Sequence, residues 1–112
     1  MVKFMITFST PANIGVFEKA YNDLLALVER MPNIERRQVV NVLGSPIGAA
    51  PYYRILEIYF DSLEQMEASL RSAAGQETGG ELGKRFTAGK YSAFYAEVYE
   101  EAGGSTLTNP KS

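Results

Sequence analysis

The chain has 112 residues and a formal net charge of −2, with both signs mixed along it, and it contains neither Cys nor His. This length predicts one domain, and the composition excludes disulfides, thiol nucleophiles, thiolate metal sites, histidine bases and the usual axial ligand of haem. With no apolar run near 20 residues, we expect a cytoplasmic protein that binds neither nucleic acid nor a membrane.

The first third of the chain predicts a strand followed by a helix. Every second residue from Val2 to Phe8 is Val, Ile or Phe, which gives a strand with one apolar face. Asn13 can cap a helix. Apolar residues then recur at three- and four-residue steps as far as Met31, and Pro32 ends the helix.

The middle of the chain predicts two strands and a second helix. The strands run from about Glu35 to Leu43 and over Tyr52–Phe60, and a loop rich in Gly and Pro separates them. Ser62 starts the helix in a capping box with Gln65. Gly75 is a natural residue to end it.

The last part of the chain predicts a loop, a strand and a tail. Residues 76–86 contain three glycines, so we expect a loop with one weak helical turn around Leu82. The last strand is Lys90–Glu100. Its alternation sets one face, made of Phe94, Ala96 and Val98, against another made of Tyr91, Ala93, Tyr95, Glu97 and Tyr99. The domain is expected to span residues 1–100, followed by a disordered tail over residues 101–112.

The order βαββαβ predicts the α+β class and a ferredoxin-like fold, with a four-stranded antiparallel sheet and both helices on one face. The opposite face would then carry Met5, Thr7, Ile55, Tyr59 and Tyr95. Such a face is too apolar for open water. A second copy of the sheet would cover it and give a dimeric α+β barrel.

Glu57 is the first candidate functional residue, because it is a carboxylate in the middle of an apolar strand. With Tyr59 beside it, it could give or take a proton in a partly apolar pocket. The alternative is a structural ion pair with Lys3 or Arg37, which is the stronger interpretation. The alternation of the last strand is expected to put Glu97 on the same face of the sheet as Glu57, but on an outer strand. We therefore interpret Glu97 as part of the rim or interface.

A second group of residues could line a pocket for a small hydrophobic ligand. Tyrosines offer flat apolar walls with a polar tip. The predicted ligand-binding residues are Tyr21, Tyr53, Ile55, Tyr95, Met5 and Asn41. We expect neither a metal site nor a cofactor.

Several short segments together resemble the EthD family (ethyl tert-butyl ether degradation proteins) of the dimeric α+β barrel superfamily. They are Met31-Pro32, Arg36-Arg37, residues 43–46, residues 51–55 and residues 57–63. The resemblance implies a homodimer with a pocket between sheet and helices. Family members accompany ether degradation by a cytochrome-type monooxygenase, and some fungal relatives act as dehydratases or cyclases. Many members carry a His in the first helix; here that stretch, residues 21–25, has none.

Three functions remain open from the sequence. The first is an accessory or ligand-binding protein in the catabolism of a small hydrophobic oxygenated compound. The second is a cofactor-free dehydratase, isomerase or oxygenase that uses Glu57 as acid or base. The third is a structural dimer without a ligand.

Overall fold

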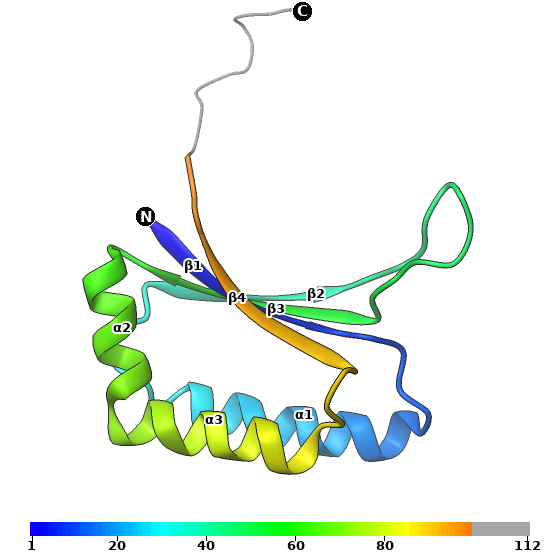
Figure 1. The fold of residues 1–112 in the computed structure, drawn as a ribbon, viewed down its shortest axis with the longest axis horizontal. Coiled ribbons are helices and arrows are strands. Elements are labelled where there is room, and N and C mark those ends of the chain that lie inside the picture. The colour runs from blue at the N-terminus through cyan, green and yellow to red at the C-terminus, as the bar shows by residue number, and fades with distance from the viewer. Residues whose placement is uncertain (100–112) are drawn as a thin grey trace, which may run out of the picture.

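The computed structural model describes residues 1–99, which form one antiparallel sheet with three helices beneath it (Figure 1). In chain order the elements are β1 (Val2–Phe8), α1 (Ile14–Val28), β2 (Arg36–Asn41), β3 (Arg54–Phe60), α2 (Leu63–Arg71), α3 (Ala73–Arg85) and β4 (Tyr91–Glu97). The strand order is β2-β3-β1-β4. The predicted ferredoxin-like fold is therefore confirmed, while the predicted tail lies outside the described residues.

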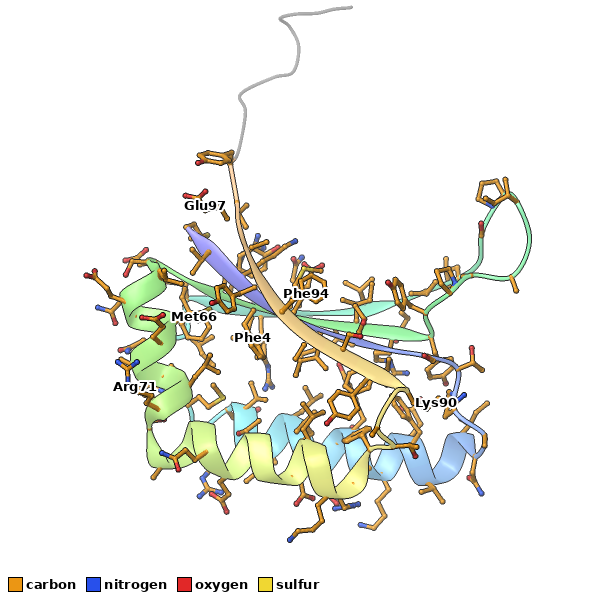
Figure 2. All side chains as sticks on the ribbon, in the orientation of Figure 1. Phe4, Met66, Arg71, Lys90, Phe94 and Glu97 are labelled. Atoms are coloured by element: carbon orange, nitrogen blue, oxygen red, sulfur yellow. The ribbon has the colours of Figure 1, made fainter. Side chains whose placement is uncertain are left out.

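The core lies between the sheet and the helices. Alternate residues of β1 and β3 point into it, and Met66 closes it from α2 (Figure 2). The fully buried side chains include Ile6, Phe8, Leu24, Val28, Leu56, Ile58 and Phe60. The predicted apolar faces of the first and third strands are thus the ones that the helices cover.

The segment after Gly75 is helical, which corrects the expectation of a loop there. Ser72 ends α2 and caps α3: its hydroxyl accepts a hydrogen bond from the Gly75 N–H (3.0 Å) and donates one to the Ser69 carbonyl (2.6 Å). Gly75 therefore lies in the first turn of α3 and does not end the preceding helix. Buried Leu82 fixes α3 against the core. These contacts outweigh the low helix propensity of the four glycines in α3.

The ends of four other elements also differ from the prediction, and β4 covers only Tyr91–Glu97. The first helix ends at Val28, and the chain then turns through residues 29–33 to keep Met31 buried. β2 and β3 are shorter than expected because residues 43–52 leave the sheet as a projecting arm. In Figure 1 this arm curves away from the helices. Element ends are where tertiary packing and turn geometry decide against local pattern.

The two faces of β4 are the reverse of the prediction. Tyr95 pairs with Phe4 and Ala93 with Ile6, so these residues face the helices. Phe94 pairs with Met5 and faces the other way. Paired residues of neighbouring strands share a face of the sheet. Phe94 is consequently the aromatic residue that β4 adds to the face without helices.

Candidate functional site

The face of the sheet turned away from the helices, here the outer face, has a polar centre within an apolar surround. The register of the four strands assigns to it Lys3, Met5, Thr7, Arg36, Gln38, Val40, Ile55, Glu57, Tyr59, Ser92, Phe94 and Ala96. Of the predicted site residues, Met5, Ile55, Glu57 and Tyr59 come together here. Glu57 and Tyr59 lie on β3, next to the central strand β1.

Glu57 is held by an ion pair and a hydrogen bond. Its Oε1 lies 3.5 Å from Lys3 Nζ, and its side chain is 14% exposed. The Tyr59 hydroxyl, on a buried ring, donates to the same oxygen at 3.0 Å and lies 3.1 Å from Gln38 Oε1. Partly buried carboxylates need such partners. The predicted pairing of Glu57 with Lys3 is present.

Arg37 does not take part in this network, although the sequence allowed it. It faces α1, where it donates to the Leu25 carbonyl (3.0 Å) and pairs with Glu29 (2.9 Å). Arg36 occupies the outer face instead, with its guanidinium 4.1 Å from the centre of the Tyr59 ring. Strand β2 begins with two adjacent arginines, Arg36 and Arg37, whose side chains point to opposite faces of the sheet. The sequence alone could not tell which of them shares a face with Glu57.

Glu97 is also on the other side of the sheet from Glu57. It pairs with Val2 in the register, is exposed, and accepts a hydrogen bond from the Tyr99 hydroxyl at 3.1 Å. The expectation that Glu97 and Glu57 share a face of the sheet is therefore wrong. The two carboxylates do not form an acid–base pair.

Tyr53, one of the predicted ligand-binding residues, lies on the helix side of the sheet and away from Glu57. It precedes β3, and its hydroxyl donates to Glu18 on α1 at 3.1 Å. Arg54 forms a two-point ion pair with Glu18 (2.7 and 2.8 Å). The Arg54 guanidinium holds the pKa of the Glu18 carboxyl below its usual value, and Glu18 raises the pKa of Tyr53. This cluster ties α1 to the sheet.

Tyr21 is part of an aromatic cluster in the core. Its ring stacks on Phe17 (5.7 Å between centroids) and meets Phe8 edge to face. The Arg54 guanidinium lies 4.7 Å from the ring centre. Burial raises the pKa of Tyr21 to about 12, so this phenol stays neutral at physiological pH.

The remaining predicted ligand residues lie apart from one another. Asn41 is exposed at the end of β2, and Tyr95 is 55% exposed on β4; both point to the helix side of the sheet. The eight predicted site residues therefore occupy both faces of the sheet and its edges. They do not form one site.

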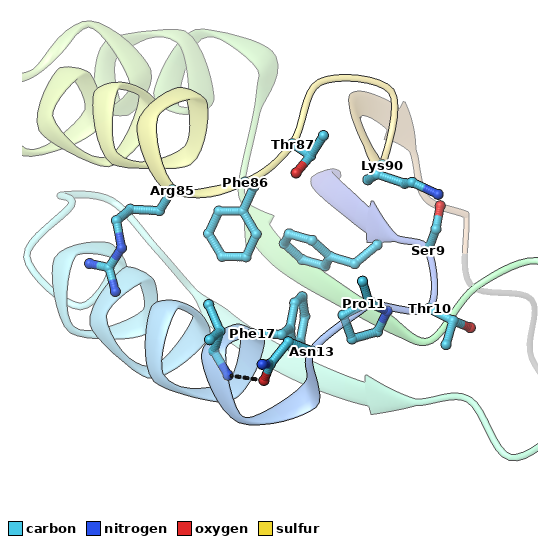
Figure 3. Close-up of a pocket in the computed structure, with 12 residues that line it drawn as sticks. Ser9, Thr10, Pro11, Asn13, Phe17, Arg85, Phe86, Thr87 and Lys90 are labelled. Carbon is cyan, nitrogen blue, oxygen red and sulfur yellow. Dashed lines mark hydrogen bonds between the residues drawn. The ribbon is translucent and has the colours of Figure 1, made fainter.

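A pocket of about 390 Å³ opens between the start of α1, the end of β1 and the connection from α3 to β4 (Figure 3). Its walls include three phenylalanines, Phe8, Phe17 and Phe86, whose ring centroids lie 5.1 to 5.7 Å apart. The other lining residues are Ser9, Thr10, Pro11, Ala12, Asn13, Val16, Arg85, Thr87 and Lys90. Its volume falls within the range of roughly 300–1,000 Å³ for small-molecule sites.

None of the predicted site residues lines this pocket, although Tyr21 and Tyr53 contact its wall residue Phe17. The sequence feature that could have indicated the pocket is Pro11, which separates an apolar strand from the apolar stripe of the first helix. Phe86 gave no usable signal, because its segment was expected to be a loop.

Two features are absent from residues 1–99. No helix in this part of the chain is long and apolar enough to cross a membrane. No group of three or more acidic side chains there could hold a metal ion.

Solved structures with the same fold are numerous, whereas no family model and no curated protein matches the sequence. An EthD family protein from Bacillus halodurans is 25% identical with a TM-score of 0.83, over 88% of this chain and 99% of that one. A dimeric ferredoxin-like protein of unknown function from Jannaschia is 13% identical, with a TM-score of 0.67 over 88% of this chain and 100% of that one.

Two enzymes share the fold at lower identity. Hydroxynitrile lyase from Passiflora edulis is 13% identical (TM-score 0.69, covering 89% of this chain and 94% of that one). SnoaB, a cofactor-independent oxygenase from Streptomyces nogalater, is 12% identical (TM-score 0.65, covering 91% and 96%). Such identities establish the fold alone. The predicted resemblance to the EthD family is confirmed: the chain is similar to a solved EthD family protein over most of its length, and it has a ferredoxin-like fold.

Proposed function

We propose that the chain is a homodimeric ligand-binding protein that holds a small hydrophobic oxygenated compound, as an accessory protein in its catabolism in the cytoplasm. The observation that carries this proposal is the pocket walled by Phe8, Phe17 and Phe86. Aromatic walls bind a flat apolar body, and a few hydroxyl groups at the rim can hydrogen-bond its oxygen atoms.

Exposed apolar side chains support the dimer. Phe94 is 44% exposed on the outer face, beside Met5. On the arm formed by residues 43–52, Leu43 is 99% exposed and Ile47 94% exposed. The arm curves toward the side of the sheet that the helices leave free (Figure 1). A second copy on the outer face would cover both groups, and the Jannaschia protein with the same fold is dimeric.

Native mass spectrometry of freshly purified protein tests the ligand. We expect a stoichiometric small molecule that leaves unchanged, and that a Val16→Trp variant loses, because Val16 lines the pocket. Ile14→Trp is the matched control, since Ile14 is exposed at the same helix end but does not line the pocket. A ligand retained equally by both variants would contradict the assignment to this pocket. An empty protein would favour the structural dimer without a ligand.

The second candidate is an enzyme that uses Glu57 as acid or base with Tyr59, without a cofactor. The hydrogen bond from Tyr59 to Glu57 favours it, and cofactor-free oxygen chemistry occurs on this fold in SnoaB. The ion pair with Lys3 favours a structural role instead. Conversion of the captured ligand, lost in Glu57→Gln, would support the enzyme. Unchanged turnover in a folded Glu57→Gln dimer would remove Glu57 from the mechanism.

A further inference from the structure

The charges around the pocket are unbalanced. Two of the residues that line the pocket are cationic, Arg85 and Lys90, and none of the lining residues is acidic. Arg85 is already paired with Glu81 and Asp23, at 2.6 and 3.1 Å. Lys90 has no ion pair within residues 1–99. One positive charge at the rim is therefore without a matching carboxylate in the described part of the chain.

The backbone fixes Lys90 at this rim. Its carbonyl accepts a hydrogen bond from the Ser9 N–H (2.9 Å), and its N–H donates to the Thr87 carbonyl (3.0 Å). Gly89 allows the turn, with φ of 85°. The hydroxyl-bearing residues Ser9 and Thr87 are thus held next to Lys90, on the side of the pocket that Figure 3 shows opposite α1.

We propose that the pocket takes an anionic ligand, a small flat apolar molecule with a carboxylate group that pairs with Lys90. The three phenylalanines would contact the apolar body, and the hydroxyls of Ser9 or Thr87 would donate to the carboxylate. The inference rests on the proposed function and narrows it from oxygenated compounds in general to acids. A chain of net charge −2 gives no general attraction for anions, so any preference must come from the local rim.

The expected effect is modest, because Lys90 is exposed. An exposed ion pair contributes roughly a few-fold in affinity. We therefore expect the protein to bind a carboxylate about two-fold to five-fold more tightly than its neutral analogue at low salt. The preference should shrink as ionic strength rises.

The test compares 2-naphthoate with 2-naphthylmethanol by calorimetry, using ligand-stripped full-length protein. Lys90→Gln should remove the preference, so that 2-naphthoate binds no more tightly than 2-naphthylmethanol. Lys84→Gln is the control, because it removes the same charge from an exposed position on α3 that does not line the pocket. A melting curve of each variant confirms folding.

The outcomes separate this inference from the function on which it rests. A preference for naphthoate that only Lys90→Gln removes supports the inference. Equal binding of both probes overturns the inference but keeps the ligand-binding function. A preference that survives Lys90→Gln overturns the role of Lys90. Binding of neither probe overturns the inference and counts against an apolar pocket for ligands.

Discussion

Replacing Phe94 by Lys should break the proposed dimer, whereas replacing its neighbour Tyr95 should not. The two residues are adjacent on β4, and both are large, aromatic and about half exposed. The register places Phe94 beside Met5 on the outer face and Tyr95 beside Phe4 on the helix side. Phe94→Lys and Tyr95→Lys therefore introduce the same charge on opposite faces of one strand.

The magnitude follows from the exposed area of Phe94. With 44% of the side chain exposed, an interface would bury about 90 Å² of a ring whose total is about 200 Å². At about 25 cal/mol per Å² this is about 2 kcal/mol per protomer. Two-fold symmetry doubles it to about 4 kcal/mol, or roughly a thousand-fold in the dissociation constant of the dimer. Burying the introduced ammonium adds a further penalty.

Light scattering during size-exclusion chromatography at micromolar concentration measures the result. We expect a dimer mass for the unmodified protein and for Tyr95→Lys, and a folded monomer for Phe94→Lys. The opposite result for the two variants would show that the face assignment on β4 is wrong. Two dimeric variants would place the interface elsewhere, and a monomeric unmodified protein would refute the dimer.

Three further outcomes are expected. Gly75→Ala should lower the free energy of unfolding by about 2 kcal/mol or more, because its Cβ would meet backbone carbonyls at the end of α2; Gly79→Ala, with open space around it, should raise that free energy by about 0.5–1 kcal/mol. Urea denaturation measures both, and equal effects would contradict the packing at Gly75. Stability should fall as pH rises from 10 to about 12, because the unfolded chain loses the Tyr21 proton first, and Tyr21→Phe should reduce this dependence. Glu57→Gln should cost about 1 kcal/mol through its pair with Lys3, and no loss would argue against that pair.

The fold was predictable because its strongest signals are local. The alternation in β1 and β3 identified the core faces, since one face of β1 is wholly apolar and the same face of β3 is apolar after Arg54. The helix α3 was not predictable in the same way. Its support comes from the Ser72 cap, from buried Leu82 and from the ion pair of Arg85 with Asp23 on α1, which join residues far apart in the sequence. Glycine content alone favours a loop there.

The prediction of which face of β4 points to the helices was wrong for a different reason. Both of its alternating sets contain apolar residues, so either could face the core. Pairing with β1 decides between them, with Tyr91 beside Phe8. That register depends on the turn at Gly89 and on where α3 ends. An error of one residue in a strand exchanges all of its side chains between the two faces, and this placed Tyr95 and Glu97 on the wrong side.

The candidate site was only partly predictable. The sequence shows which residues of a strand are polar, but it does not show where a cavity lies beside the strand. Glu57 stood out as a carboxylate in an apolar strand, and its pairing with Lys3 follows from the register. The pocket arises where the ends of β1, α1 and α3 meet, from residues that look like ordinary core or turn positions. No pattern within one element could reveal it.

The sheet separates the two proposed sites, and this makes them independently testable. Phe94 and Glu57 lie on the outer face, whereas the pocket with Val16 lies on the helix side. If dimerisation and ligand binding use opposite faces, Phe94→Lys should lose the dimer and keep the ligand, and Val16→Trp should do the reverse. Additivity is expected for such distant positions. A monomeric Phe94→Lys that also loses its ligand would mean that the pocket is complete only in the dimer, with the partner supplying part of its wall.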